Sequence, residues 1–409
     1  MTTAETHANQ RSLTLLCWSA VLAFFSYSMA RSPILPLYGQ TLGLGAAAIG
    51  WIVAASTITG IFCKLPAGAL SDVYGRRRML LCSGLVFAGM PFLYPLAASE
   101  QSLILLRVLH GLATAIFGPV AGAAVADLFQ ERRAEAMGWY TSSRTGGNLL
   151  GPFVAGALIS VVGFHLAFTA SGLAGLAALG AITLFGRRLP APGTLAEAPQ
   201  MADKSRRAFG EMAKGLREVL RNKYILTTSG IEAVEYFALG TVEAFLPLYA
   251  VSIGYPAWQI GVLFGVQAGV ALLARPLVGR VADRVGRRPV IFAGVVAGGC
   301  FLMLVPFVEA FSLLLAVVML FGLAEAVATS ATAALAADFA RPEAYGLALG
   351  VFGTIMDVGH AAGPVVAGLL VAAFAFRVTF AVVGLLLIVA GFYFIALVPE
   401  PRNLRVAVE

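Results

Sequence analysis

The chain has 409 residues, of which 59% are hydrophobic and only 12% are Asp, Glu, Lys or Arg. An ordinary soluble domain carries about 25% charged residues, so this chain has too few to cover a water-facing surface of its size. The composition therefore excludes an ordinary soluble enzyme. The 4 cysteines lie in apolar runs without CxxC spacing, which indicates neither a metal site nor a disulfide framework.

Twelve apolar runs are long enough to cross a bilayer, which takes about 20 residues of helix. The first six runs are 13–38, 47–70, 79–97, 102–128, 135–162 and 166–185. The second six are 223–250, 258–280, 289–308, 312–338, 344–371 and 376–398. The sequence therefore predicts an all-α membrane protein with twelve transmembrane helices in two six-helix repeats. Residues 1–12 are polar and the first run can span, so we expect an uncleaved anchor rather than a signal peptide.

The runs divide the chain into three expected parts. Residues 1–185 form an N-terminal six-helix bundle, 186–222 a cytoplasmic linker, and 223–409 a C-terminal six-helix bundle. Within the linker, 204–221 places Phe209, Met212 and Leu216 on one helical face with basic residues opposite. This pattern is typical of an amphipathic helix at the lipid headgroups. A plain solvated linker is the alternative.

The basic residues indicate the orientation of the spans. Most Lys and Arg residues fall in the even-numbered links, the linker and the terminal segments, whereas the odd-numbered links hold essentially Arg377 alone. Because cytoplasmic links are rich in Lys and Arg, we expect both termini in the cytoplasm, in the plasma membrane if the source is bacterial. The net charge of +7 thus reflects topology, and we expect no nucleic-acid partner.

The two halves are repeats of each other. Asp72 and Asp283 are 211 residues apart, as are Arg76 and Arg287. The segments GNLLGPFVAG and GHAAGPVVAG begin at positions 147 and 359 and align at an offset of 212. An even number of spans per repeat keeps both halves in the same orientation, as in transporters built from parallel repeats.

Four motifs resemble a known family. GALSDVYGRRR at 68–78 resembles the signature loop of the major facilitator superfamily, and GRVADRVGRRP at 279–289 repeats it. The string LLRVLHGLATA in span 4 resembles the arginine motif of that family. The glycine-proline pattern in span 5 and PILP at the end of span 1 resemble its twelve-span drug:proton antiporter branch. The resemblance covers the whole chain and implies two bundles with alternating access.

By this resemblance, the signature loops form a gate on the cytoplasmic side. The expected gating residues are Gly68, Asp72, Gly75, Arg76, Arg77, Asp127, Gly279, Asp283, Gly286, Arg287 and Asp338. We expect Arg76 or Arg77 to pair with Asp127, with Asp283, Arg287 and Asp338 as equivalents in the second half. The alternative is that these charges set topology and form no latch.

Spans 5 and 11 carry an expected helix-bend motif. Its residues are Gly147, Gly151, Pro152, Gly156, Gly359, Gly363, Pro364 and Gly368. Small residues permit tight helix packing, and proline permits a bend because it removes one backbone donor. A bend that seals one side of the transporter is the functional hypothesis, and helix packing alone is the alternative.

Charged residues inside the spans carry the most functional information, because each costs about 2.5–3.5 kcal/mol at the bilayer centre. The candidates for substrate binding or proton coupling are Arg31, Arg107, His110 and Arg144 in the first half, and Glu232, Glu235, Glu243, Glu325, Asp357 and His360 in the second. One half is cationic and the other mostly anionic, as expected for walls that face one cavity. We expect Lys64 and Arg275 to extend to the cytoplasmic surface instead.

Three hypotheses assign roles to these residues. Arg107 is expected to favour the charged form of a nearby acid and so to couple protons to cargo; a structural ion pair is the alternative. Arg144 and Asp357 lie at similar depth in opposite halves. We expect them to hold opposite ends of a polar or zwitterionic cargo, or to bridge when the cavity is empty.

The third hypothesis concerns three carboxylates. Glu232 and Glu235 are one turn apart in span 7 and share a face, and Glu235 and Glu325 both fall near mid-span. Two close carboxylates in a low dielectric do not readily both ionise, so one is expected to hold a proton. Glu235 is the expected proton carrier and Glu325 the second candidate; a cation-binding role in the cargo site is the alternative.

Together these features predict a secondary active transporter that exports a small organic molecule in exchange for protons. The alternatives are proton symport or facilitated uptake of a small organic anion, and a non-transporting membrane sensor. The chain has no G-K-[ST] string, which excludes a phosphate-binding loop of that kind, and no catalytic set is visible. We expect no enzymatic activity, no cofactor and a monomer whose partners are cargo, protons and the bilayer.

Overall fold

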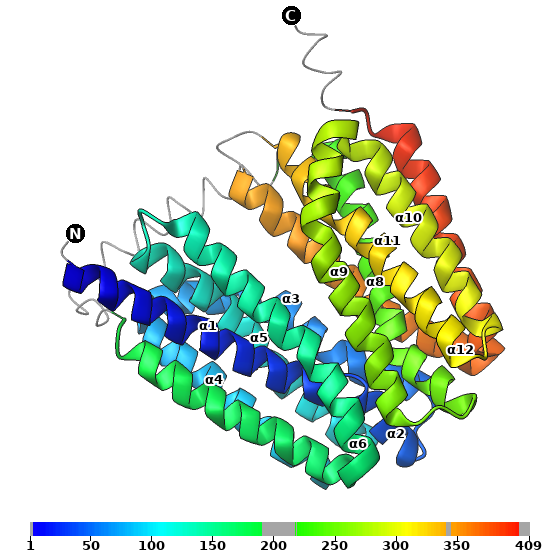
Figure 1. The fold of residues 1–409 in the computed structure, drawn as a ribbon, viewed down its shortest axis with the longest axis horizontal. Helices are drawn as coiled ribbons and strands as arrows, with labels where there is room; N and C mark the ends of the chain where they lie inside the picture. The colour runs from blue at the N-terminus through cyan, green and yellow to red at the C-terminus, as the bar shows by residue number, and fades with distance from the viewer. Residues whose placement is uncertain (1–2, 190–216, 218, 341–344, 401–409) are drawn as a thin grey trace, which may run out of the picture. The chain divides into compact units, whose positions relative to one another are not determined.

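The computed structural model describes residues 3–189, 217, 219–340 and 345–400, and the elements within these ranges are helices (Figure 1). The first half contains α1 (Thr3–Arg31), α2 (Ile34–Thr41), α3 (Ala46–Tyr74), α4 (Arg76–Leu93), the short η1 (Tyr94–Leu96), α5 (Glu100–Leu128) and α6 (Arg133–Gly186). The second half contains α8 (Lys223–Ser252), α9 (Ala257–Val285), α10 (Arg287–Leu304), the short η3 (Val305–Phe307), α11 (Phe311–Asp338) and α12 (Tyr345–Leu397). The expected all-α membrane fold is confirmed.

Within the described residues, 10 helical stretches are long and apolar enough to cross a membrane. Two of them, α6 with 54 residues and α12 with 53, contain a residue with non-helical angles. These residues are Gly163 (φ 77°) and Ala375 (φ 64°), and both lie in links expected from the sequence. Both helices double back along their length (Figure 1). Counting each of these two helices as two spans would give twelve, and the predicted number of spans stays a prediction.

The chain clusters into two compact units, which are described separately. The first comprises Met1–Glu197 with Ala250–Gly265, and the second Ala198–Tyr249 with Val266–Glu409. The beginning of α9 is thus grouped with the first unit and its remainder with the second. The expected amphipathic helix at 204–221 lies mostly outside the described residues; at its end, Val219 is buried beside Ile225 and Ala348.

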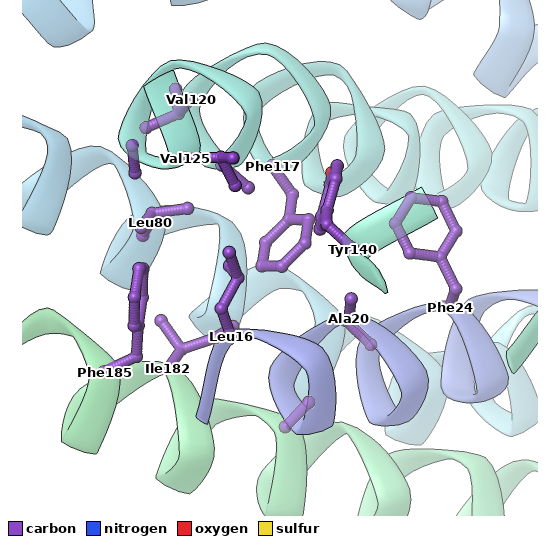
Figure 2. Packing of buried hydrophobic residues seen from close by; sticks show 14 of the residues in the cluster. Leu16, Ala20, Phe24, Leu80, Phe117, Val120, Val125, Tyr140, Ile182 and Phe185 are labelled. Atoms are coloured by element: carbon purple, nitrogen blue, oxygen red, sulfur yellow. The ribbon is translucent and has the colours of Figure 1, made fainter. Parts of the chain in front are cut away.

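In the first unit, α1 packs along α6, α3 along α5, and α4 against both α5 and α6. Aromatic and branched apolar side chains from α1, α4, α5 and α6 pack together in its interior (Figure 2). Phe24 of α1, Phe117 of α5 and Phe87 of α4 pack edge to face or tilted, with ring centroids 5.9–6.3 Å apart. This core fixes the rotation of α1 and α5, and therefore the direction in which their polar side chains point.

The glycines of the expected bend motif lie at close helix contacts. A Cβ on Gly147 of α6 would lie 2.4 Å from the carbonyl oxygen of Val21, and one on Gly151 would lie 2.7 Å from the backbone nitrogen of Met29. Only glycine allows the two backbones to approach this closely. Pro152 lies within α6, so the proline does not end the helix.

In the second unit, α10 packs along α11 and α12. The second bend motif packs α12 against α8 in the same manner. A Cβ on Gly359 would lie 2.0 Å from the carbonyl oxygen of Ala233, and one on Gly363 would lie 2.1 Å from that of Phe237. Both motifs therefore serve tight helix packing, and their function as bends that seal the transporter stays a prediction.

Candidate functional site

The first unit holds a buried guanidinium among hydroxyl groups. Arg107 of α5 is 0% exposed, and its Nη2 donates a hydrogen bond to Ser56 Oγ of α3. Tyr27 of α1 donates its hydroxyl to the same Ser56 oxygen at 2.9 Å, and the guanidinium lies 5.4 Å from the Tyr27 ring centroid. Ser56 and the aromatic face thus replace part of the hydration that the buried cation loses.

Gly111 explains how α5 comes close enough to α3 for this bond. A Cβ on Gly111 would lie 2.7 Å from the carbonyl oxygen of Ser56. In the second unit, a Cβ on Gly322 would lie 2.6 Å from the carbonyl oxygen of Gln267. Gly322 lies 211 residues after Gly111, and Gln267 lies 211 residues after Ser56. The repeats therefore share the helix contact, while Arg107 belongs to the first alone because Val318 stands at its matching position.

His110 follows Arg107 by one turn and is also 0% exposed. Its Nδ1 shares a hydrogen bond of 3.1 Å with the Tyr94 hydroxyl, and its ring meets the Tyr27 ring edge-on at 4.9 Å. Its Nε2, together with Nε and Nη1 of Arg107, makes no hydrogen bond of normal geometry to the described residues. The polar groups nearest to Arg107 in the first unit are the hydroxyls of Ser56, Tyr27 and Tyr94. The expectation that Arg107 favours the charged form of a nearby acid stays a prediction.

The second unit holds the buried carboxylates. Glu232 and Glu235 of α8 are 4% and 1% exposed, and Glu325 of α11 is 7% exposed. Glu235 lies close enough to the other two to interact with both electrostatically. Thr332 of α11 donates its hydroxyl to Glu232. The structure therefore brings together the three carboxylates that the sequence singled out.

Glu235 differs from its neighbours in its surroundings. Neither of its carboxylate oxygens has a hydrogen-bond partner among the described residues. Glu325, by contrast, has the Arg275 Nη2 at 4.0 Å. A buried carboxylate without a donor is costly in its charged form, and the expected role of Glu235 as proton carrier stays a prediction.

Arg275 and Gln267 are two further polar residues of the second unit near the carboxylates. Arg275 was expected at the cytoplasmic surface, but its guanidinium also lies beside the buried Glu325. Gln267 is 4% exposed, and its Oε1 has no hydrogen-bond partner in the described part of the chain. Sequence reasoning missed Gln267, Ser56, Tyr94 and Thr332. A search for polar residues at matching repeat positions finds the Ser56 and Gln267 pair.

A second acid-base pair lies on α8 and α12. His360 Nε2 is 2.9 Å from Glu243 Oε2, and the His360 ring meets the Tyr236 ring edge-on at 5.5 Å. Gly240 permits this approach, since a Cβ there would lie 2.7 Å from the His360 carbonyl oxygen. Asp357, one turn earlier on α12, is 7% exposed. Of the five acidic candidates for substrate binding or proton coupling in the second half, Glu232, Glu235, Glu325 and Asp357 are buried and Glu243 is partly buried.

The remaining expected cations lie in the first unit. Arg31 ends α1 and is partly buried. Arg144 of α6 is exposed, with its guanidinium 5.4 Å from the Phe24 ring centroid. The pairing of Arg144 with Asp357 would join the two units and stays a prediction.

The signature loops form ion pairs in both units. Arg76 lies 2.6 Å from Asp72 and 3.2 Å from Asp127, and Arg287 lies 3.0 Å from Asp338. Gly75 (φ 89°) and Gly286 (φ 105°) precede α4 and α10 with backbone angles that favour glycine. Arg76 or Arg77 was expected to pair with Asp127, and in the structure Arg76 forms this ion pair. The Arg77 side chain instead packs beside Gly186 at the end of α6.

Glu400 adds a contact that the sequence analysis missed. Its carboxylate accepts hydrogen bonds of 3.1 Å from each of the backbone nitrogens of Arg287 and Arg288. These nitrogens begin α10 and have no partner within the helix, so the carboxylate caps the helix and complements its dipole. At the offset of 212 that holds in this part of the repeats, the matching position is Arg188, whose side chain has no acceptor for these bonds.

Known proteins resemble the chain over most of its length. The family model for the Major Facilitator Superfamily matches residues 16–281 and 236–408. "Multidrug resistance protein MdtG" of Enterobacter lignolyticus is 26% identical over 394 residues, covering 94% of this chain and 91% of that protein. "Multidrug resistance protein 2" of Bacillus subtilis is 23% identical over 365 residues, covering 88% and 89%.

Solved structures show the same fold at lower identity. A bacterial homologue of the human lysosomal transporter Spinster, in an inward-facing and unoccupied conformation, gives a TM-score of 0.81 at 15% identity, covering 95% of this chain and 96% of that one. The multi-pass helical fold, the repeated signature loops and the match to the family model along nearly the whole chain lead to one assignment: the protein belongs to the Major Facilitator Superfamily of membrane transporters.

Proposed function

We propose that the protein is a proton-coupled exporter of a small organic molecule that works by alternating access between two six-helix bundles. The bundles would be residues 1–185 and 223–409, joined by 186–222, with both termini in the cytoplasm and the protein acting as a monomer. The printed names of the two multidrug resistance relatives support export of organic molecules. The observation that supports proton coupling most directly is Glu235, a buried carboxylate without a hydrogen-bond partner among the described residues.

The proposed exchange follows from the chemistry of this carboxylate. In a low dielectric, Glu235 is stable either with a proton or beside a cation, and its neighbours Glu232 and Glu325 disfavour a further negative charge. When the site opens outward, a proton binds and cargo leaves. When it opens inward, cargo binds and the proton leaves. Arg107 and His110 would change their contacts with Ser56, Tyr27 and Tyr94 when the proton binds or leaves.

The signature loops would control opening on the cytoplasmic side. The Arg76–Asp127 and Arg287–Asp338 ion pairs hold each loop to the end of the neighbouring helix in its own unit. Both pairs are partly exposed, so each contributes little to stability and can break at little cost. They are therefore suited to a latch that opens in each cycle.

Flux in proteoliposomes tests the proposal. Purified protein is reconstituted, and a panel of organic cations, anions and zwitterions is followed with and without an imposed pH gradient. We expect at least one compound to move against its own gradient and opposite to the proton flow. Movement of an anion together with protons would instead support symport, and flux that ignores the pH gradient would reject proton coupling.

A further inference from the structure

The buried cation of the first unit has no anionic partner in the described part of the chain. Arg107 is 0% exposed, and the groups that interact with it electrostatically are the phenols of Tyr27 and Tyr94 and the His110 ring, none of them a carboxylate. An arginine stays charged inside a protein, so it cannot avoid the cost of burial by releasing its proton. A buried charge without a counter-charge is strongly destabilising. The fold therefore holds a positive charge that a bound anion would compensate.

The nitrogens around this charge are donors without acceptors. Nε and Nη1 of Arg107 and Nε2 of His110 make no hydrogen bond to the described residues. The Tyr94 hydroxyl lies 3.1 Å from His110 Nδ1, and when it donates there, a neutral imidazole carries its hydrogen on Nε2. All three nitrogens then offer a hydrogen atom. Such a set is complementary to an acceptor that carries negative charge.

The two side chains border the same space beside α1. The Tyr27 ring centroid lies 5.4 Å from the guanidinium carbon of Arg107 and 4.9 Å from the centroid of the His110 ring. His110 follows Arg107 by one turn of α5 and is close enough to interact with it electrostatically. Both residues are 0% exposed. This enclosure selects a small inorganic ion and excludes an organic cargo molecule.

The second repeat shows that the helix contact does not require these polar groups. At the offset of 211, the residues that match Arg107, His110 and Tyr94 are Val318, Phe321 and Val305. All three are buried, with exposed fractions of 2%, 1% and 3%. Apolar side chains are thus sufficient to pack these positions, so packing alone does not explain the donors of the first repeat.

We propose that the first unit binds a small inorganic anion, such as chloride, between the Arg107 guanidinium and His110 Nε2. The anion compensates the charge of Arg107 and accepts the hydrogen bonds that the chain leaves unused. Its binding requires neither cargo nor proton coupling, so a failure of proton-coupled flux leaves this proposal unaffected. The competing explanation is a buried water molecule, which satisfies donors but leaves the charge uncompensated.

Thermal unfolding of the purified full chain in detergent tests the proposal. Sodium gluconate is replaced stepwise by sodium chloride at constant ionic strength, because gluconate is too large for an enclosed site. A ligand that binds only the folded protein raises its unfolding temperature, so we expect a rise of about 2–4 °C once chloride exceeds its Kd several-fold. Bromide should act in the same way. An unfolding temperature that is equal in chloride and gluconate would overturn the proposal and favour water.

Variants that copy the second repeat locate the effect. Arg107→Val should abolish the stabilisation by chloride. His110→Phe keeps the guanidinium and removes one donor, so it should raise the half-saturating chloride concentration by about two- to ten-fold. Arg78→Gln, which removes an exposed guanidinium of α4, is the control and should keep the full effect. If Arg107→Val does not fold, His110→Phe decides, and a chloride response in it equal to that of the wild type would overturn the proposal.

Bromide also locates the ion directly, because its anomalous scattering identifies it in crystals. Crystals of the full chain grown in bromide should show an anomalous peak within hydrogen-bond reach of Arg107 Nη1 and His110 Nε2. Crystals of Arg107→Val should lack this peak. Density for water alone between the two side chains would overturn the proposal.

Discussion

Gly147 lies so close to the backbone of Val21 that a Cβ there would be 2.4 Å from the Val21 carbonyl oxygen. Gly359 and Ala233, each 212 residues further along the chain, repeat this relationship at 2.0 Å. The duplication has thus preserved an atomic contact between two helices as well as a sequence motif. These contacts position α1 and α8, and with them Tyr27 and Glu235.

The first prediction concerns this packing. Gly147→Ala and Gly359→Ala should each lower the free energy of unfolding by about 1–3 kcal/mol, because the added methyl forces the helices apart. Gly146→Ala and Gly353→Ala are the controls, since a Cβ at either position meets nothing within 4 Å. Thermal unfolding of the purified variants measures the effect. If the Gly147 and Gly146 variants were equally stable, the helices could accommodate a methyl group between Gly147 and Val21, and the close contact would not contribute to stability.

The second prediction uses the breaks in the two longest helices. Ala375 has φ 64° and ψ 177°, a backbone conformation found almost exclusively for glycine, and its repeat counterpart is Gly163 with φ 77°. Ala375→Gly should therefore raise the free energy of unfolding by about 1 kcal/mol. Gly163→Ala should lower it by a similar amount. A decrease in stability for Ala375→Gly would contradict this account of the break.

The third prediction addresses the latch in the second unit. Asp338→Asn removes the 3.0 Å ion pair with Arg287. It should slow transport while changing the free energy of unfolding by less than about 1 kcal/mol, because the pair is partly exposed. The charge exchange Arg287→Asp with Asp338→Arg should recover part of the rate. Flux and thermal unfolding are measured on the same preparations, and an unchanged rate for Asp338→Asn would remove the pair from the gate.

The fourth prediction concerns the cap on α10. Glu400→Ala leaves the backbone nitrogens of Arg287 and Arg288 without their acceptor, which should cost about 1 kcal/mol of stability. Glu400→Gln keeps one acceptor oxygen and should cost less. Glu131→Ala, at an exposed acid in the connection between α5 and α6, is the matched control. If the Glu400 and Glu131 variants unfold at the same temperature, the cap does not contribute.

The sequence was sufficient for features that depend on spacing along one helix or on the repeat. Glu232 and Glu235 share a face because they are one turn apart, and the structure places them together with Glu325. The partner of Asp338 was found because Arg287 and Asp338 repeat the positions of Arg76 and Asp127. The membrane class follows from composition alone, since 12% charged residues cannot cover a soluble surface.

Contacts between side chains on different helices were harder to predict, because they depend on how each helix is rotated. Ser56 reaches Arg107 only because Gly111 draws α5 against α3, and the sequence does not show this proximity. Arg275 was expected to extend to water, which its long side chain permits, but Glu325 lies within 4.0 Å and offers it a partner. Glu400 lies 113 residues from the nitrogen that it caps, so no local pattern reveals it.

Glu235→Gln tests most directly whether Glu235 carries the proton, because glutamine matches the shape of glutamate and cannot take up or release a proton. The measurement compares two fluxes in the same proteoliposomes: cargo uptake driven by a pH gradient, and cargo counterflow without one. We expect Glu235→Gln to lose the driven uptake and keep counterflow, while Glu309→Gln keeps both. Driven uptake at the wild-type rate in Glu235→Gln would contradict it.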